Sequence, residues 1–334
     1  MGRPAVPAVL LFSLLLANVI GAQTTPHTSE VPSVPGKFFD YAVTILMENA
    51  GINDTNAYVN NNVCPPLGGC YVLGNPSLPF MNSFYLTHAV AEGYTAISHP
   101  SEPNYCGLTS GNYSSTCVNV CCFTENATNI VDGLESVGLT WQAYAEKSSN
   151  SGLCSFMPDD ASHFPLLFYQ DMNTPARCAN FLATTAPTDP EFLAALNSTT
   201  TANFYWLTPS GNDSCHDMGT TSYCDSYLKN LVTSILNTQL FTTRRAVLFI
   251  TFDEGGGKYP NDYVYTVLAG PQVKTGYVST VQYSHYSWLK TIEDNWNLPC
   301  LANDCTALSM TEFFTNSTAG SNTPALGGGP PLPF

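Results

Sequence analysis

Short runs of apolar and β-branched residues recur along the chain, and polar clusters follow several of them. Five such runs have no helical period and predict strands, at residues 41–47, 139–144, 203–209, 245–252 and 263–269. Three segments with apolar residues at helical spacing predict helices, at residues 78–89, 223–240 and 288–296. Strands alternate with helices, which predicts an α/β fold with a mainly parallel central sheet and helices on both faces.

Carboxylates and an amide follow two of the predicted strands. Glu48 and Asn49 come directly after residues 41–47, and Asp253 and Glu254 stand between the run that ends at residue 252 and three glycines. The carboxyl ends of parallel strands meet at one edge of a sheet, where ligands bind, so we expect these side chains to lie together with strand 245–252 central. Adjacent carboxylates repel, and a cation relieves this. The alternative is a strand end with a solvated acidic turn.

The proposed ligand atoms are all oxygens, which predicts one divalent metal ion. Mg²⁺, Mn²⁺ and Ca²⁺ are favoured over Zn²⁺, because zinc prefers nitrogen and sulfur partners.

A candidate nucleophile lies in the polar turn 98–105. Ser101 is followed two residues later by a proline, as at a helix N-terminus, which is a natural anion site. A cation next to Ser101 would lower the pKa of its hydroxyl and suit it to phosphoryl transfer. His216, flanked by acids, is the first candidate to protonate the leaving alkoxide, ahead of His285 and then His163. An ordinary capping serine is the alternative for Ser101.

The two ends of the chain differ in composition from its middle. Residues 1–22 have the charged, apolar and small-residue regions of a secretory signal peptide, and residues 23–36 predict a flexible lead. Residues 37–319 predict a single domain, and residues 320–334 a disordered Gly/Pro tail. A retained membrane anchor is the alternative for the apolar run, but the run is short for a bilayer span, so we expect no stable anchor.

Cysteines and glycosylation sequences agree with export. The chain has 12 cysteines, and disulfides persist outside the cytosol. Close spacing predicts the local bridges Cys64–Cys70, Cys215–Cys224 and Cys300–Cys305. A zinc site of four cysteines is the alternative, but paired C-x-x-C spacings are missing. Six Asn-x-Ser/Thr sequences predict N-glycans, at Asn53, Asn112, Asn126, Asn197, Asn212 and Asn316. We therefore expect a secreted, extracellular glycoprotein.

Charge limits the possible partners. The chain has 10 Lys plus Arg against 25 Asp plus Glu, a formal net charge of -15 at pH 7. Such a surface repels nucleic acid and anionic membranes, so we expect no nucleic-acid partner. Self-repulsion of this kind relaxes in an acidic medium, where carboxylates lose charge.

Five short motifs, taken together, resemble a known family. They are MEN at 47–49, HPSEPNY at 99–105 with SG at 110–111, DxxHD at 213–217, TFDEGGG at 251–257 and YSHYS at 283–287. In this order, over about residues 41–304, the chain resembles the phosphoesterase family. That family includes secreted fungal and bacterial acid phosphatases and bacterial phospholipases C, and it is a branch of the alkaline phosphatase-like superfamily.

The resemblance implies an alkaline phosphatase-like fold and a catalytic metal. A single ion would be held by Glu48, Asn49, Ser101, Asp253 and Glu254. Ser101 would be the nucleophile that becomes phosphorylated and is then hydrolysed.

The resemblance also implies substrate contacts. His216 and His285 would touch the phosphate or the leaving group, with Asn104 and Asp217 as substrate-binding residues. Many relatives carry Asp-His a few residues after the glycines, where this chain has Asp262 followed by tyrosine, so a role for Asp262 is not carried over.

We therefore expect a secreted, metal-dependent phosphoesterase that acts through phosphoserine. An acid phosphatase that hydrolyses small phosphate monoesters is favoured, because the chain is compact for the family and lacks the extra C-terminal domain of the larger phospholipases C. A phospholipase C-type phosphodiesterase is the first alternative. The second is a metal-independent serine esterase, although the chain has no Gly-x-Ser-x-Gly elbow.

Overall fold

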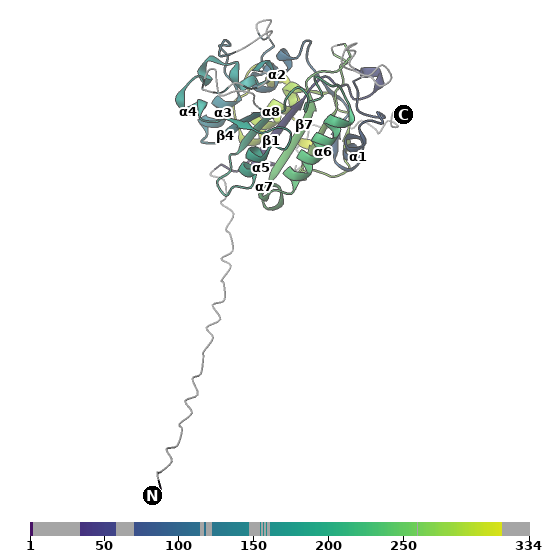
Figure 1. Cartoon of the computed structure of the whole chain (residues 1–334). Helices are drawn as coiled ribbons and strands as arrows, with labels where there is room; N and C mark the ends of the chain where they lie inside the picture. The colour runs from purple at the N-terminus through teal and green to yellow at the C-terminus, as the bar shows by residue number, and fades with distance from the viewer. Residues whose placement is uncertain are drawn as a thin grey trace.

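A computed structural model describes most of the chain between residues 34 and 315. The described residues are 1–2, 34–57, 70–113, 117, 122–146, 154, 156, 158, 161–258 and 260–315. Nearly all of the predicted signal peptide and lead, the predicted tail, Cys64 and Asn316 lie outside them. Within the described part, helices surround one large sheet (Figure 1).

The sheet has eight described strands in the order β5-β4-β6-β1-β7-β8-β2-β9. Their bounds are β1 Tyr41–Met47, β2 Ala89–Ala91, β4 Trp141–Glu146, β5 Phe181–Thr184, β6 Phe204–Thr208, β7 Ala246–Phe252, β8 Thr266–Ala269 and β9 Val278–Ser279. The five strands from β5 to β7 are parallel to one another, whereas β8 runs antiparallel to β7 and β2. A mainly parallel sheet with β7 near its centre is thereby confirmed. A parallel pair, β3 (Tyr94–Thr95) and β10 (Tyr283–Ser284), lies outside it.

Strands β1 and β7 have their carboxyl ends side by side, and the candidate site lies at these ends. They pair over their whole length, from Tyr41 opposite Ala246 to Met47 opposite Phe252. All of their residues are buried, so both strands read in the sequence as continuous apolar runs. The Asp253 amide still donates to the Met47 carbonyl at 2.9 Å, so the residues that follow the two strands emerge side by side.

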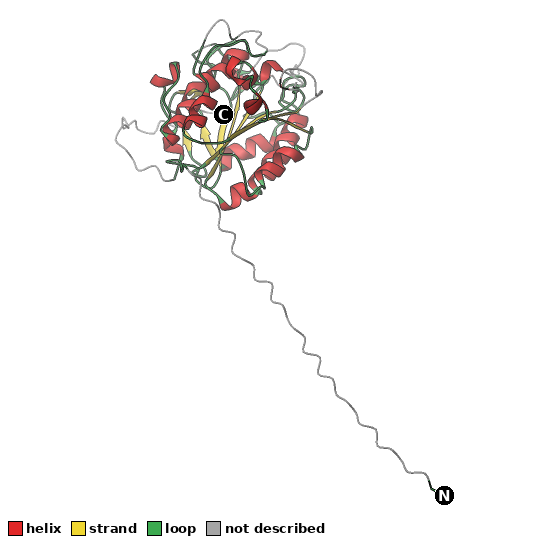
Figure 2. Ribbon diagram, turned by 90° about the vertical axis from the view of Figure 1, so that its left-hand side faces the viewer, coloured by secondary structure: helices red, strands yellow, loops and turns green. Residues whose placement is uncertain are grey.

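Helices cover both faces of the sheet (Figure 2). Their bounds are α1 Pro79–Thr87, α2 Glu102–Ser110, α3 Ile130–Ser136, α4 Pro175–Cys178, α5 Pro190–Leu196, α6 Ser222–Leu236, α7 Gln239–Thr243 and α8 His285–Trp296. Helix α2 packs beside α8, and α6 packs beside α1, α5 and α7. None of the helices within the described ranges has the length and apolar character that a bilayer span requires.

The helix predicted at 223–240 is in fact two helices. Helix α6 ends at Leu236 with Asn237 as its C-cap, and the extended backbone of Thr238 precedes α7. The Thr238 hydroxyl donates to the Ile235 carbonyl at 2.6 Å. The apolar periodicity of the sequence continues through this break, so the periodicity does not reveal where α6 ends.

One aromatic contact anchors α8 to the sheet. The rings of Trp288 and Phe249 on β7 stack with centroids 4.1 Å apart and an interplanar angle of 5°. The Trp288 indole also donates to the Thr44 hydroxyl on β1 at 3.0 Å. Because α8 is fixed against both strands, its first residue, His285, is held beneath the loop that follows β7.

Disulfides among the described residues are Cys106–Cys117, Cys154–Cys178, Cys215–Cys224 and Cys300–Cys305. The two predicted bridges that fall entirely within the described part of the chain are thereby confirmed. The third, Cys64–Cys70, involves a cysteine outside it.

Candidate functional site

Glu48, Asn49 and Asp253 converge at the carboxyl ends of β1 and β7. The Asn49 amide donates to Asp253 Oδ1 at 2.9 Å, which ties the two loops together. Asn49 has φ 58, a left-handed conformation that asparagine adopts more readily than most residues. All three side chains are buried, and Asp253 has no exposed surface. The two strand ends therefore bring together two carboxylates and an amide from distant parts of the sequence.

Ser101 reaches this cluster from the N-terminus of α2. Its hydroxyl donates to Glu48 Oε2 over 3.4 Å, and the Tyr105 hydroxyl donates to Glu48 Oε1. Residues four apart lie on the same face of a helix, so one face of α2 presents both hydroxyls to one carboxylate. The Ser101 side chain makes no capping bond to the α2 backbone. The geometry therefore does not favour the alternative that Ser101 is an ordinary capping serine.

The electrostatics of the cluster fit a bound cation. Burial, and next the charge of Asp253, raise the pKa of Glu48 well above its usual range. Among the described residues, no lysine or arginine pairs with either carboxylate. Asn49 Oδ1 and Asp253 Oδ2 are buried without a hydrogen-bond partner in the same part of the chain. Unpaired buried oxygens are costly in a protein interior, and a hard divalent cation would satisfy them.

Two histidines add nitrogen donors next to Glu48. His163 Nε2 lies 3.7 Å from Glu48 Oε2, and the His163 ring stacks on Tyr105 with centroids 5.5 Å apart. One ligand atom each of Glu48, His163 and His216 lie within 4.8 Å of one another. His216 Nδ1 is 2.8 Å from Asp217 Oδ1, which fixes the ring. A donor set that includes imidazoles also suits transition metals, so oxygen ligands alone do not describe this site.

Glu254 pairs with His99, a histidine that was not among the predicted site residues. His99 Nδ1 is 2.8 Å from Glu254 Oε2, and His99 Nε2 is 3.3 Å from Asp262 Oδ2. Hydrogen bonds to Asp262 and Glu254 raise the pKa of His99 to about 11, and burial raises the pKa of Glu254 to about 7. We therefore describe His99 as an imidazolium that bridges two carboxylates beside the cluster.

The glycines after Glu254 wrap around the Asp262 carboxylate. The amides of Gly255 and Gly257 donate to its two oxygens at 2.9 and 2.7 Å. A Cβ atom at Gly255 would lie 2.7 Å from Asp262 Oδ1 and 2.9 Å from the backbone of Gly51, so this approach requires glycine. Asp262 thus holds the loop in place, a role that the motif comparison did not assign to it.

His285 and Asn104 lie one layer behind the cluster. His285 Nε2 is 2.6 Å from the Asp253 carbonyl, and His285 Nδ1 is 3.2 Å from the Tyr94 hydroxyl. Burial lowers the pKa of His285 to about 4. Asn104 Oδ1 accepts from the amides of Ile97 and Ser98 at 2.9 and 3.2 Å, so this side chain braces the turn that leads to α2. The structure thus places both predicted residues in the interior, hydrogen-bonded to neighbouring backbone groups.

The sequence and the fold of this chain are similar to those of known phosphoesterases. The profile of the Phosphoesterase family matches residues 72–299. A probable acid phosphatase of Kluyveromyces lactis is 27% identical over 322 residues, covering 92% of this chain and 70% of the relative. A phosphatidylinositol-3-phosphatase of Mycobacterium tuberculosis is 29% identical over 232 residues, covering 68% and 73%. A solved protein of the alkaline phosphatase superfamily from Vibrio parahaemolyticus superposes with a TM-score of 0.56 at 12% identity, covering 84% of this chain and 73% of that one.

Proposed function

We propose, from the premise that this chain belongs to the Phosphoesterase family and hydrolyses phosphoric esters, that it is a metal-dependent phosphomonoesterase of acid-phosphatase type. The substrate would be a small phosphate ester, and Ser101 would carry the phosphoryl group between two half-reactions. The observation that carries the proposal is the Ser101 hydroxyl 3.4 Å from Glu48 Oε2, beside the unpaired oxygens of Asn49 and Asp253.

The ligands that we assign to the metal are Glu48, Asn49, Asp253, Glu254 and the Ser101 hydroxyl. His163 is close enough to Glu48 to contribute a nitrogen donor, whereas His216 keeps its second ring nitrogen for proton transfer. When bound, a divalent ion would neutralise the buried carboxylates, lower the pKa of the serine hydroxyl and offset charge on the phosphate.

The chain's own residues supply the nucleophile and the proton. The Ser101 hydroxyl passes its proton to its hydrogen-bond acceptor, Glu48 Oε2, and Oγ forms a bond to phosphorus while the bond from phosphorus to the alcohol oxygen breaks. The N-terminus of α2 favours the negative charge of the phosphoryl oxygens. His216, oriented through Nδ1 by Asp217, gives its other ring proton to the departing alkoxide. Water then hydrolyses the phosphoserine, which releases inorganic phosphate and restores the Ser101 hydroxyl.

We assign positioning roles to His285 and Asn104. His285 has both ring nitrogens engaged, with the Asp253 carbonyl and the Tyr94 hydroxyl, and it is fully buried. It therefore fixes the backbone that presents Asp253, and His216 remains the candidate acid. Asn104 orders the turn before Ser101 in the same indirect way.

We also propose that the protein is secreted and N-glycosylated. Three acceptor asparagines, Asn126, Asn197 and Asn212, are exposed, as attachment of a glycan requires. The disulfides agree with an oxidising compartment. Mass spectrometry of the protein from a eukaryotic host, before and after enzymatic removal of N-glycans, tests this directly.

The proposed activity is tested with p-nitrophenyl phosphate. We expect hydrolysis that is lost in EDTA, restored by Mn²⁺ or Mg²⁺, and reduced at least about a thousandfold in Ser101→Ala. Ser226→Ala is a matched control, because Ser226 is an exposed serine on α6. Full activity in Ser101→Ala would refute the mechanism, and insensitivity to EDTA would favour a metal-free esterase. Faster hydrolysis of phosphatidylcholine would overturn the preference for monoesters.

A further inference from the structure

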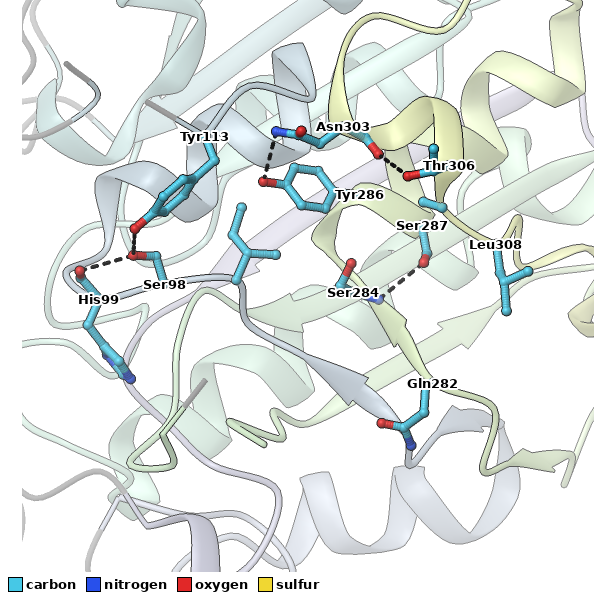
Figure 3. A pocket seen from close by; sticks show the side chains of 12 residues that line it. Ser98, His99, Tyr113, Gln282, Ser284, Tyr286, Ser287, Asn303, Thr306 and Leu308 are labelled. Carbon is cyan, nitrogen blue, oxygen red and sulfur yellow. Dashed lines mark hydrogen bonds between the residues drawn. The ribbon is translucent and has the colours of Figure 1, made fainter. Parts of the chain in front are cut away.

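A cavity beside the candidate site has no role in the proposed mechanism. It has a volume of about 640 Å³ and lies between the turn before α2, the start of α8 and the segment 303–308 (Figure 3). Ligand pockets of drug-sized molecules span about 300 to 1,000 Å³, so the cavity is large enough for one or two sugar-sized rings.

The cavity adjoins the proposed phosphate position. His99 belongs to its lining and is also the residue 2.8 Å from Glu254 Oε2. Ser98, a second lining residue, precedes Ser101 by three positions, and Ser284 and Tyr286 flank His285. A phosphate ester held at Ser101 would therefore have the cavity within reach of its alcohol part.

The lining is polar and aromatic but carries almost no charge. Apart from His99, which is paired with Glu254 and Asp262, none of the lining residues is a lysine, arginine, aspartate or glutamate. Two tyrosines present their rings and hydroxyls. Tyr113 is 53% exposed and its hydroxyl is 3.3 Å from the Ser98 hydroxyl, while the Tyr286 hydroxyl accepts from Asn303 Nδ2 at 3.4 Å (Figure 3).

The two amides at opposite sides of the cavity have capacity to bind a ligand. Gln282 Oε1 accepts from the Tyr263 hydroxyl at 3.1 Å, and in the described part of the chain the hydrogens on its nitrogen meet no acceptor. Asn303 is exposed at the other side. A ligand without hydroxyls would leave these groups unpaired once water is displaced, which costs affinity. The apolar side chain of Leu308, 58% exposed, can pack on the C–H face of a ring.

We propose that this cavity binds the alcohol part of the substrate and that this part is an uncharged, polyhydroxylated group, such as a sugar or a cyclic polyol. The proposal rests on the proposed function, since it assigns the leaving group of the same reaction. An anionic leaving group would find no lysine or arginine in the lining and would be repelled by the chain's net charge of -15. A plain alkyl group would leave the hydrogens on the Gln282 amide nitrogen without an acceptor.

Four phosphate monoesters that differ in their alcohol part test the proposal. We would measure kcat/KM for glucose 6-phosphate, 6-phosphogluconate, cyclohexylmethyl phosphate and methyl phosphate, using wild-type protein, Gln282→Ala/Asn303→Ala and the control Asn173→Ala. Wild type should prefer glucose 6-phosphate to the other three. In the double variant, the ratio of kcat/KM for glucose 6-phosphate to that for methyl phosphate should fall about tenfold, mainly through KM, because two hydrogen bonds are lost. The exposed Asn173 lies outside the cavity, so its variant should keep the ratio.

The outcomes separate the two proposals. Absence of hydrolysis of every substrate by wild-type protein would overturn the proposed function and this inference together. Hydrolysis with an unchanged ratio in the double variant would overturn the inference alone. So would a wild-type preference for 6-phosphogluconate or for cyclohexylmethyl phosphate, since these would show an anion-binding or an apolar cavity.

Discussion

The free energy of unfolding should fall as pH rises, and replacing Glu146 with glutamine should remove much of this fall. Glu146 is the last residue of β4, is 1% exposed, and its Oε2 accepts from the Ser210 amide at 2.6 Å. The Ser210 hydroxyl donates to Asp213 at 3.2 Å, so a second carboxylate lies close by. Burial, and next the charge of Asp189, raise the pKa of Glu146 to about 9. The folded protein therefore keeps a proton on Glu146 at neutral pH.

The sign and size follow from proton linkage. Below pH 4.5, the ordinary value for glutamate, Glu146 is protonated in both the folded and the unfolded chain, so it adds no pH dependence. Between pH 4.5 and about 9 only the folded chain holds the proton, so the free energy of unfolding falls as pH rises. At 1.36 kcal/mol per pH unit, the span from pH 4.5 to pH 7 gives a penalty of about 3 kcal/mol.

Glutamine resembles the protonated acid and has no proton to lose. Its amide oxygen can accept from the Ser210 amide, and its NH₂ group can take the place of the protonated oxygen. We expect Glu146→Gln and wild type to be about equally stable at pH 4, with the variant more stable by up to about 3 kcal/mol at pH 7. Urea unfolding at both pH values, followed by circular dichroism, measures this difference. Glu191→Gln is the control, because Glu191 is exposed and its pKa is lowered, so its loss should not stabilise the protein as pH rises.

A variant that is destabilised at pH 7 would refute this reasoning. That result would mean that Glu146 is ionised in the folded protein, with its charge balanced by something other than a proton. An unchanged pH dependence would equally show that Glu146 does not hold the proton on which the calculation depends.

Three further substitutions test the site and the core. Tyr105→Phe removes a donor to Glu48 and should weaken Mn²⁺ binding about tenfold, as measured by calorimetric titration; unchanged affinity would show that this hydroxyl does not orient Glu48 toward the metal. His216→Gln should lower kcat for methyl phosphate about 100-fold but lower kcat less for p-nitrophenyl phosphate, whose leaving group needs no proton, and equal losses would argue against His216 as the acid. Trp288→Ala should lower the free energy of unfolding by about 3–5 kcal/mol in urea, because Trp288 is buried and stacked on Phe249; a loss below about 1 kcal/mol would contradict the anchoring role of α8.

The central strands were predictable because burial on both faces leaves a strong sequence signal. Strands β1 and β7 are seven residues each with every position buried, and both were predicted to within one residue. Three short strands, β5, β2 and β9, were not predicted. β2 has three residues and β9 two, which is too short for a pattern to emerge. A buried strand reads the same in either direction, so the antiparallel course of β8 could not be derived from its apolar run.

In the candidate site, too, some residues could be placed from the sequence and others could not. Strand topology alone predicted that Glu48 and Asp253 would lie together, because the ends of neighbouring parallel strands converge. The positions of His163 and His99 depend on how loops fold across the sheet, and no spacing in the sequence encodes that. For Tyr105 a signal did exist, since a helix beginning after Ser101 places the residue four positions later on the same face.

The most direct test of the account is to look for phosphate on Ser101. Wild-type protein would be mixed with p-nitrophenyl phosphate, quenched in acid within milliseconds, digested and analysed by mass spectrometry, with Ser101→Ala treated in parallel. We predict one phosphoryl group on the peptide that contains Ser101, formed during turnover and absent from the variant. Turnover without a phosphorylated Ser101 peptide would contradict the proposed mechanism.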